Sequence, residues 1–369
     1  MIAADSMFDA GDVRAMQRAL QLAALGLETT DPNPRVGCVL VRDGQIVGEG
    51  WHERAGEAHA EVLAIEAAGQ SARGATAYVT LEPCSHFGRT PPCTEALIRA
   101  HVGRVVFATE DPNPEVHGAG ASKLRAAGIV VEQGLCAQAA QALNAGFFKR
   151  MRTGLPLIRL KIAMSLDGRT ALANGQSQWI SGEAARADVQ RWRARSSAVL
   201  TGIGTILADD PRLTVRQPAQ APRQPMRVIL DARWRTPRAA RVFEGTAPVI
   251  IFGAPSEVQR AQVCERPGVQ RICEDPHDLS AVLAALGRMS LNEILVEAGP
   301  TLSGAFLSAG LVDELIVYVA PILLGPQARA MADFAALEHL SDARRFELRE
   351  SIKIGKDLRL ILQNPAPEV

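Results

Sequence analysis

The chain has 369 residues, more than one compact core usually absorbs, so we expect two domains. Hydrophobic residues make up 47% of the sequence and charged residues 22%, which is typical of a globular protein. Forty basic residues balance forty acidic ones, and this zero formal net charge argues against a dedicated nucleic-acid binder, which normally has a basic excess.

The chain begins with an acidic segment, Met1–Asp12, that lacks the basic stretch and apolar core of a secretory signal. No uninterrupted apolar run reaches the ~18 residues that a membrane helix needs. In a long chain without a signal, six cysteines are more typical of reduced thiols or metal ligands than of a disulfide framework. We therefore expect a cytoplasmic protein with no membrane partner, in which Cys136, Cys264 and Cys273 are ordinary thiols.

The first part of the chain alternates predicted helices and strands, which favours an α/β layered domain. Apolar residues at helical spacing predict an amphipathic helix over Val13–Leu25. Asp43-Gly44 between two apolar runs is a strong hairpin signal. The predicted strands are Gly37–Val41, Ile46–Gly50, Ala75–Leu81 and Arg104–Ala108, and the further predicted helices are Ala60–Gly69, Glu95–Ala100, Ser122–Gly128 and Ala137–Met151.

A domain boundary is predicted where the last of these helices ends. Thr153-Gly154-Leu155-Pro156 breaks the helical pattern, and Gly followed closely by Pro is a good stop signal. We expect a first domain of residues 1–152 and a second of residues 153–369, also α/β. Its predicted strands are Leu157–Ala163, Ala198–Thr201, Arg227–Leu230, Val249–Phe252, Ile294–Glu297 and Glu314–Val319, with helices near Glu183–Arg195, Leu279–Met289 and Leu302–Ala309.

The chemistry of the first domain is concentrated in two short stretches, His59-Ala60-Glu61 and the pair Pro83-Cys84 and Pro92-Cys93. One imidazole and two thiolates are natural zinc ligands that leave the fourth position open for water, whose pKa the metal lowers towards neutrality. Glu61 is close enough to His59 to move protons without binding the metal. This order of residues matches zinc base deaminases, except that the cysteines are usually two residues apart and here the insert is Ser85–Pro92.

A purely structural zinc is the alternative. It would need a fourth protein ligand, for which His52, His86 and Cys38 are nearby candidates. Glu61 argues for catalysis, because a structural site has no need of a carboxylate beside an open metal position. We expect one zinc per chain, bound by His59, Cys84 and Cys93.

The long insert makes the pattern specific. Leu81–Cys93, together with Asn33–Gly37 and Gly50-Trp51-His52, closely resembles the deaminase domain of the bifunctional riboflavin-biosynthesis deaminase/reductase family. The resemblance implies a cytidine-deaminase-like fold and a substrate that is a diamino-ribosylaminopyrimidinone 5′-phosphate, deaminated at C2. It also implies that Asn33 hydrogen-bonds the pyrimidine ring and that His52 and His86 border the pocket; from the residues alone, Asn33 before Pro34 could be only a turn residue.

The second domain supports the same resemblance. Lys161–Arg169 is similar to the opening strand of the family's reductase domain, which has a dihydrofolate-reductase-like fold, and Ser177–Ile180, Leu207–Arg216 and Glu297–Leu302 match further segments. The resemblance implies that NADPH reduces the ribosyl C1′ to give a ribityl chain. The substrate side is then expected to include Lys161, Ser177, Arg193, Leu213, Arg216 and Glu297, and the cofactor side Ala163, Trp179, Thr205, Asp209, Gly299, Pro300, Thr301 and Leu302.

Physical arguments support some of these positions. Lys161 lies in an apolar strand, where a buried ammonium needs an anionic partner, although it could also reach water at a strand edge. Arg193 and Arg216 suit a substrate phosphate by charge and shape. Gly299-Pro300-Thr301 can open a helix whose amides hold a cofactor phosphate. No GxGxxG motif is present, so a Rossmann domain is not indicated.

The main alternative function is a tRNA or nucleoside deaminase with an accessory domain, which would use the same zinc ligands together with a basic face. The neutral charge and the second enzyme-like domain argue against it. We expect a small-molecule substrate, no nucleic-acid partner and a homo-oligomer.

Overall fold

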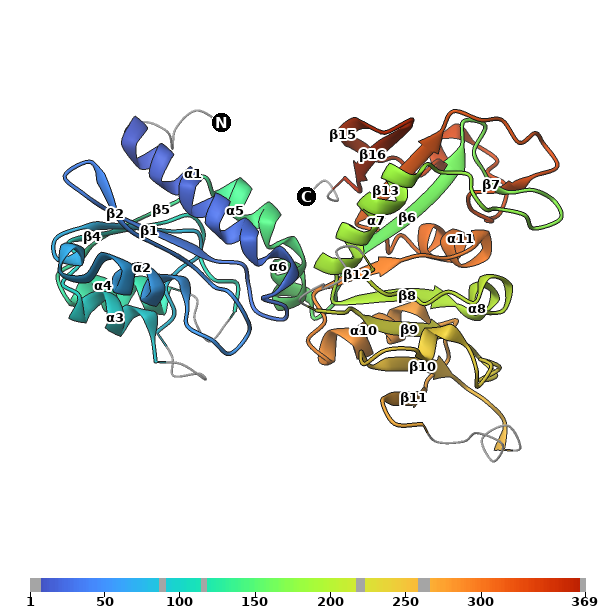
Figure 1. Ribbon diagram of the computed structural model, residues 1–369, viewed down its shortest axis with the longest axis horizontal. Helices are drawn as coiled ribbons and strands as arrows, with labels where there is room; N and C mark the ends of the chain where they lie inside the picture. The colour runs from blue at the N-terminus through green and yellow to red at the C-terminus, as the bar shows by residue number, and fades with distance from the viewer. Residues whose placement is uncertain (1–7, 86–90, 114–117, 217–222, 258–265, 366–369) are drawn as a thin grey trace. The chain divides into compact units, whose positions relative to one another are not determined.

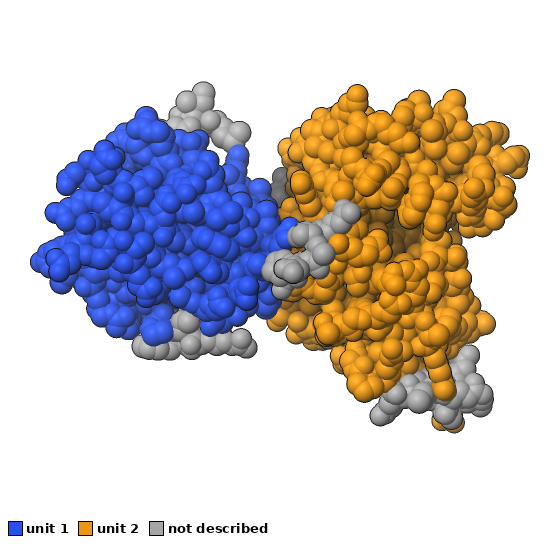
Figure 2. All heavy atoms as spheres, in the orientation of Figure 1, with its two compact units in different colours: residues 1–155 blue, residues 156–369 orange. Residues whose placement is uncertain are grey.

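The computed structural model describes residues 8–85, 91–113, 118–216, 223–257 and 266–365. The chain divides into two compact units, Met1–Leu155 and Pro156–Val369 (Figure 2). The division falls in the Gly154–Pro156 turn. No helix among the described residues combines the length and the apolar character that crossing a bilayer requires.

A five-stranded sheet forms the centre of the first unit, in the order β2-β1-β3-β4-β5 (Figure 1). Strand β1 is antiparallel to β2 and β3, whereas β3, β4 and β5 are parallel. The strands are β1 (Gly37–Arg42), β2 (Gln45–Trp51), β3 (Thr76–Val79), β4 (Arg104–Phe107) and β5 (Val130–Gln133). The helices are α1 (Ala10–Ala24), α2 (Ala60–Ala68), α3 (Cys93–Arg99), α4 (Ala119–Ala126), α5 (Ala137–Leu143) and α6 (Ala145–Thr153).

Helices cover both faces of this sheet, because side chains alternate between the faces along each strand. Met16 of α1 and Ala140 of α5 pack in one cluster with Val39. Ala64 of α2 and Leu97 of α3 pack in a second cluster, which also includes buried residues of α4. Figure 1 shows α1 and α5 on one side of the strands and α2, α3 and α4 on the other. The second cluster underlies the predicted zinc ligands described below.

The predicted hairpin is present, and Asp43-Gly44 forms its turn. Both residues have positive φ, 52° and 74°, as a two-residue type I′ turn requires. The strands that it joins pair with Arg42 opposite Gln45. The turn chemistry therefore determines the register of β1 and β2.

The single helix predicted over Ala137–Met151 is wrong, since the structure has two helices separated at Asn144. The Asn144 side chain is fully buried; it accepts a hydrogen bond from the Arg35 N–H at 2.8 Å and donates one to the Arg35 carbonyl at 2.9 Å. The Asn144 backbone leaves the helical region, with φ −113° and ψ 21°. A tertiary contact overrides the local helical pattern.

The second unit is built on a nine-stranded sheet, in the order β11-β10-β9-β8-β12-β6-β13-β16-β15. The seven strands from β11 to β13 in that order are parallel, and β16 and β15 continue the sheet antiparallel. The strands of this sheet are β6 (Leu157–Ser165), β8 (Ala198–Gly202), β9 (Met226–Leu230), β10 (Val249–Gly253), β11 (Val269–Cys273), β12 (Glu293–Val296), β13 (Glu314–Ala320), β15 (Glu347–Ile354) and β16 (Asp357–Gln363). The short strands β7 (Arg169–Ala171) and β14 (Arg329–Ala330) pair with each other in a separate two-stranded sheet. The helices are α7 (Glu183–Arg195), α8 (Ile203–Asp209), α10 (Leu279–Arg288) and α11 (Pro300–Ser308).

Both faces of the parallel strands are buried, as expected for a sheet that helices cover on each side. Val199 and Leu295 pack in one cluster with Val189 of α7. The alternate positions Leu200 and Ile294 are also fully buried. The carboxyl ends of these parallel strands meet at one edge of the sheet, where α/β proteins commonly bind ligands.

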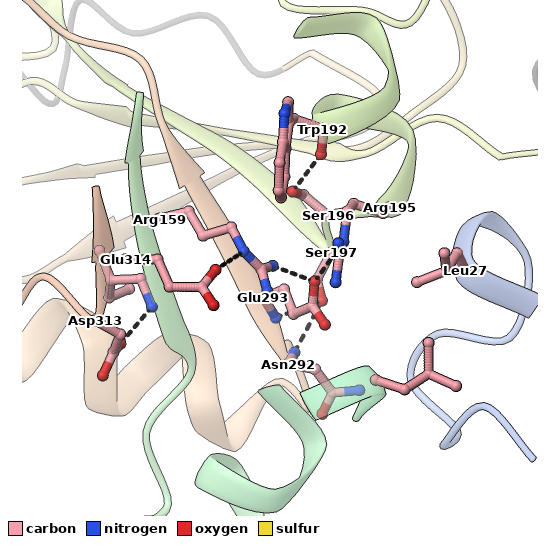
Figure 3. Close-up of polar contacts among 12 residues, drawn as sticks. Leu27, Arg159, Trp192, Arg195, Ser196, Ser197, Asn292, Glu293, Asp313 and Glu314 are labelled. Atoms are coloured by element: carbon pink, nitrogen blue, oxygen red, sulfur yellow. Dashed lines mark hydrogen bonds and ion pairs between the residues drawn. The ribbon is translucent and has the colours of Figure 1, made fainter. Parts of the chain in front are cut away.

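A buried ionic cluster lies at the opposite, amino end of the same strands. Arg159 of β6 is 2% exposed and forms ion pairs with Glu293 and Glu314, the first residues of the neighbouring strands β12 and β13 (Figure 3). Arg195 adds a second cation at 3.4 Å from Glu293. Because these charges are paired with one another inside the protein, the cluster is structural.

Candidate active sites

The three predicted zinc ligands come together in the first unit. His59 is the residue that precedes α2, Cys84 lies in the segment after β3, and Cys93 is the first residue of α3. Helices α2 and α3 pack against the same face of the sheet, and this brings their amino ends to one place.

The distances between these side chains fit one metal ion. Their ligand atoms all lie within 4.8 Å of one another. His59 Nδ1 is 3.1 Å from Cys93 Sγ and 3.6 Å from Cys84 Sγ, and the Cys93 N–H donates to Cys84 Sγ at 3.3 Å. One nitrogen and two sulfurs at this spacing are a suitable donor set for zinc with a fourth position open.

The two thiols have opposite pKa shifts. A hydrogen bond from Cys93 lowers the pKa of the Cys84 thiol to about 4, and His59 adds to the effect. The hydrogen bond to Cys84 and burial both raise the pKa of Cys93. The opposite shifts favour Cys84 over Cys93 as the thiolate, and metal binding must displace the proton of any ligand thiol that carries one.

Glu61 lies in the first turn of α2 and is 3% exposed. Burial raises its pKa, and the neighbouring Cys84 charge adds to that shift. It lies within hydrogen-bonding reach of Cys93. A carboxylate with a raised pKa beside the metal ligands is suited to accept and return a proton near neutral pH.

Asn33 and His52 form the next layer of this site. The His52 ring is 5.3 Å from the His59 ring, centroid to centroid. His52 Nδ1 donates to the Ala58 carbonyl at 3.1 Å, so His52 Nε2 accepts from the Asn33 amide at 3.1 Å. Burial lowers the pKa of His52, which favours this neutral form. The predicted His86 lies outside the described residues.

In the second unit, three predicted residues meet in one charge cluster. Lys161 Nζ lies 3.2 Å from the Glu297 carboxylate, which supplies the anionic partner that an ammonium in this strand needs. Arg193 binds the same carboxylate in a fork, with distances of 2.5 and 3.0 Å. Two cations hold the pKa of Glu297 well below its usual range despite its burial. Glu297 is therefore a carboxylate that two cations orient.

The predicted phosphate-binding residues divide into two kinds. The Arg193 guanidinium is occupied by Glu297 and by the Thr214 carbonyl at 3.0 Å, so a phosphate contact of Arg193 stays a prediction. Arg216 is an exposed residue, and partial desolvation of its guanidinium together with the charges of Arg193 and Arg212 lowers its pKa. Leu213, three residues before Arg216 in the sequence, is buried and has a positive φ of 54°. This cationic region around Arg216 suits an anion.

The predicted cofactor residues lie along the carboxyl edge of the sheet. Thr205 and Asp209 belong to α8, which follows β8, and Gly299 precedes α11, which follows the adjacent strand β12. Gly299 has no side-chain cap, and a Cβ added to it would meet open space. An uncapped, accessible helix start leaves backbone amides for a phosphate group, so this edge fits a dinucleotide.

The remaining predicted residues of the second unit are Ala163, Ser177 and Trp179. Ala163 lies on β6 two residues beyond Lys161, and Ser177 and Trp179 lie between β7 and α7. Trp179 is 67% exposed, and the Arg186 guanidinium lies 4.5 Å from the centre of its ring. An exposed indole fits a ligand-facing position better than the core position that tryptophan usually takes.

Two family models match the chain. The cytidine and deoxycytidylate deaminase zinc-binding region matches residues 10–109, and the RibD C-terminal domain matches residues 156–360. The chain is also 52% identical, over 363 residues, to the riboflavin biosynthesis protein RibD of Escherichia coli, a match that covers 94% of this chain and 98% of that protein. The chain belongs to the RibD family.

Solved structures of the family have the same fold. RibD of Acinetobacter baumannii, form 1, is 50% identical with a TM-score of 0.89, over 96% of this chain and 99% of that one. A diaminohydroxyphosphoribosylaminopyrimidine deaminase/5-amino-6-(5-phosphoribosylamino)uracil reductase from Thermotoga maritima is 34% identical with a TM-score of 0.88, over the same shares. The chain is therefore a bifunctional deaminase and reductase of riboflavin biosynthesis that uses zinc and NADPH.

Sequence reasoning missed Glu82, which precedes the Pro83-Cys84 pair. This carboxylate is 3% exposed and accepts hydrogen bonds from the N–H groups of Gly118 at 3.0 Å and Ala121 at 3.1 Å. Glu82 thereby ties the segment that carries Cys84 to the start of α4. An acid directly after the predicted buried strand that ends at Leu81 was the available signal.

Proposed function

We propose that the first unit removes the amine at C2 of 2,5-diamino-6-ribosylamino-4-pyrimidinone 5′-phosphate, and that the second unit reduces the ribosyl group of the product with NADPH. The final product is 5-amino-6-(5-phosphoribitylamino)uracil. Support comes from the name of the Thermotoga maritima relative, which states both activities. The observation that carries the proposal is the gathering of His59, Cys84 and Cys93 within 4.8 Å, with Glu61 buried beside them.

The deaminase step uses water as the nucleophile. Zinc held by the three ligands makes water reactive near neutral pH. Glu61 takes a proton from the attacking water and delivers it to the C2 amine, which leaves as ammonia. The Asn33 amide nitrogen is bound to His52, so its oxygen is the atom that accepts a hydrogen bond from the pyrimidine. His52 and His86 border the pocket.

When bound, NADPH would supply the hydride that reduces C1′ of the ribosyl group, and the bond from C1′ to the ring oxygen would break. Lys161, which Glu297 holds at 3.2 Å, supplies the proton to that oxygen. Arg193 fixes the orientation of Glu297. Arg216 binds the phosphate, and Ser177 and Leu213 line the substrate side.

The residues that would hold NADPH lie at the carboxyl edge of the second sheet. Gly299, Pro300, Thr301 and Leu302, at the start of α11, would bind its phosphates. Ala163, Trp179, Thr205 and Asp209 would bind the rest of the cofactor.

One experiment tests both halves. The purified chain is given the diaminopyrimidinone phosphate with and without NADPH, and the products are identified by mass spectrometry. We expect the deaminated ribosyl compound alone without NADPH and the ribityl product with it. Recovery of unchanged substrate from zinc-loaded enzyme would contradict the proposal. A tRNA or nucleoside deaminase is less well supported, since it gives no role to the cluster of Lys161, Arg193 and Glu297.

We also propose that the enzyme is a cytoplasmic homo-oligomer that does not bind nucleic acid. The balanced charge of the chain supports the last point. Light scattering measures the oligomeric state, and a monomer at micromolar concentration would contradict this part. Salt-sensitive RNA binding in a filter assay would contradict the absence of nucleic acid.

A further inference from the structure

The turn of the C-terminal hairpin packs against the start of α7. Strands β15 and β16 pair as far as Ile354 opposite Asp357, so Gly355-Lys356 forms a two-residue turn. Helix α7 is in contact with β15, and Figure 1 shows the hairpin at the edge of the sheet beyond β13. No residue of this hairpin has a role in the proposed mechanism.

Asp357 accepts a hydrogen bond from the helix start. It is 1% exposed, and its Oδ2 accepts from the Gly182 N–H at 2.6 Å. Gly182 is the N-cap residue of α7. In a capping box, the side chain at the third helical position binds the N–H of the N-cap residue, but in α7 that residue is Ala185. Asp357 therefore supplies, from a distant strand, the acceptor that the first turn of α7 lacks.

Two glycines allow the turn to approach the helix closely. A Cβ on Gly182 would lie 3.2 Å from Lys356 Cε and 3.3 Å from Asp357 Oδ2, and a Cβ on Gly355 would lie 2.9 Å from Ala184 Cβ. Gly355 also has a positive φ of 61°, which favours glycine. Because a larger residue at either position would push the turn away from the helix, both segments are adapted to this contact.

The start of α7 also holds the segment that precedes it. Arg186 donates to the Ser181 carbonyl at 2.6 Å, and its guanidinium lies 4.5 Å from the centre of the Trp179 ring. The N–H of buried Ile180 donates to the Ser177 carbonyl at 3.1 Å. Ser177 and Trp179 are the residues of this segment that are proposed to line the substrate and cofactor sides. Their positions therefore depend on where α7 begins.

The middle of α7 has a separate anchor. Asp188 accepts hydrogen bonds from the Tyr318 hydroxyl at 2.6 Å and from the Arg359 guanidinium at 2.5 Å. Further along the helix, Arg193 is held by Glu297. Loss of the Asp357 contact should therefore release the start of the helix and leave Arg193 in place.

We propose that Asp357 is a positioning residue of the reductase site, which fixes the start of α7 and, through it, Ser177 and Trp179. The inference rests on the proposed roles of those two residues. A site whose residues are already ordered binds its ligand without the conformational cost of ordering them. Asp357 then acts on the affinity for NADPH and substrate, whereas Lys161 acts on the chemical step.

Binding and kinetic measurements on the full chain test this role. Asp357→Ala should raise the Kd of NADPH, measured by fluorescence titration, and the KM of the deaminated intermediate about 5- to 30-fold each, with reductase kcat nearly unchanged. Asp357→Asn keeps an acceptor oxygen and should restore most of the affinity. Hydrogen exchange followed by mass spectrometry should be faster at the start of α7 in Asp357→Ala and normal beyond Asp188.

Asp278→Ala is the matched control. Asp278 also binds a helix start, since it accepts from the Ala281 N–H at 3.0 Å, but its helix is α10, which leads to the amino end of β12. This variant should leave the NADPH Kd and the KM unchanged. Gly182→Ala adds a methyl group that crowds the hairpin turn, so it should reproduce the loss of affinity even if Asp357→Ala does not fold.

Normal NADPH Kd and KM in folded Asp357→Ala, or in Gly182→Ala where Asp357→Ala does not fold, would overturn the proposal. A fall in kcat alone, or an equal loss of affinity in Asp278→Ala, would also overturn it. Wild-type enzyme that deaminates but binds no NADPH would instead refute the cofactor assignment, and this inference with it.

Discussion

The two candidate sites are assembled in different ways. The zinc site takes its ligands from the starts of α2 and α3 and from the segment after β3, and its critical atoms are soft donors that few other chemistries require. The proposed reductase site takes Lys161 from β6, Arg193 from α7 and Glu297 from the position directly after β12, and its critical groups are common charges. The first site is defined by residue type, and the second by which charges the fold brings together. The sites share no residue, so each should be removable without the other.

The largest expected effect is the loss of zinc. A Cys84→Ser/Cys93→Ser variant replaces both thiolates with weaker ligands and should lose its metal and all detectable deamination. Elemental analysis and a deaminase assay measure these two losses. Reduction of the separately supplied deaminated intermediate should continue at the normal rate. Full zinc retention would show that these cysteines are not the ligands, and loss of both activities in a folded variant would show that the sites are coupled.

The next effect is confined to proton transfer. Glu61→Gln keeps the size of the side chain and removes the titrating carboxylate, so deamination should fall about 10²- to 10⁴-fold while zinc content and folding are retained. Steady-state kinetics on the diaminopyrimidinone phosphate provide the rate. Near-normal turnover would place the proton shuttle elsewhere.

A third prediction uses two cations on the same strand. Lys161→Ala leaves Glu297 paired with Arg193, so the fold should survive, while reductase kcat falls about 10²- to 10⁴-fold because the proposed proton donor is lost. Arg159→Met should do the opposite and destabilise the second unit by about 3–5 kcal/mol, because it leaves buried Glu293 without its partner on β6. Denaturant unfolding and kinetics on both variants measure the contrast. Normal turnover in Lys161→Ala would make Lys161 structural as well.

The same contrast explains what the sequence could predict. His59, Cys84, Cys93 and Glu61 could be assigned from residue type and order alone, and the structure brings the three ligands together. The pairing of Arg193 with Glu297 could not be assigned from the sequence, because the position of an arginine on a helix face does not indicate which distant carboxylate it will contact. The sequence therefore indicated a phosphate role for Arg193 where the structure shows a contact with Glu297.

The fold shows a similar limit. Helix α7 was predicted with the bounds that the structure has. Strands β15 and β16 were missed, because β15 is mostly exposed and lacks a buried face to produce a pattern. The break between α5 and α6 was missed because it depends on Arg35, which is far away in the sequence. Local sequence patterns predict helices and strands, but contacts between distant segments can be identified only from the structure.

The smallest expected effect comes from Asn144, which separates α5 from α6. It tests whether the two units fold independently. Asn144 binds both backbone groups of Arg35, and Arg35 follows the Asn33-Pro34 pair that is proposed to contact the pyrimidine. Asn144→Ala leaves a buried N–H and carbonyl unpaired, which should lower the unfolding free energy of the first unit by about 1–3 kcal/mol. Deaminase KM should rise as Asn33 loses its support, with kcat nearly unchanged, since the zinc ligands and Glu61 lie on other segments. The second unit should unfold as in the wild type and keep its reductase activity. Urea unfolding followed separately by zinc release and by loss of NADPH binding distinguishes the two units. Equal destabilisation of both would mean that they unfold as one, and the independence inferred from their sites would then not extend to their folding.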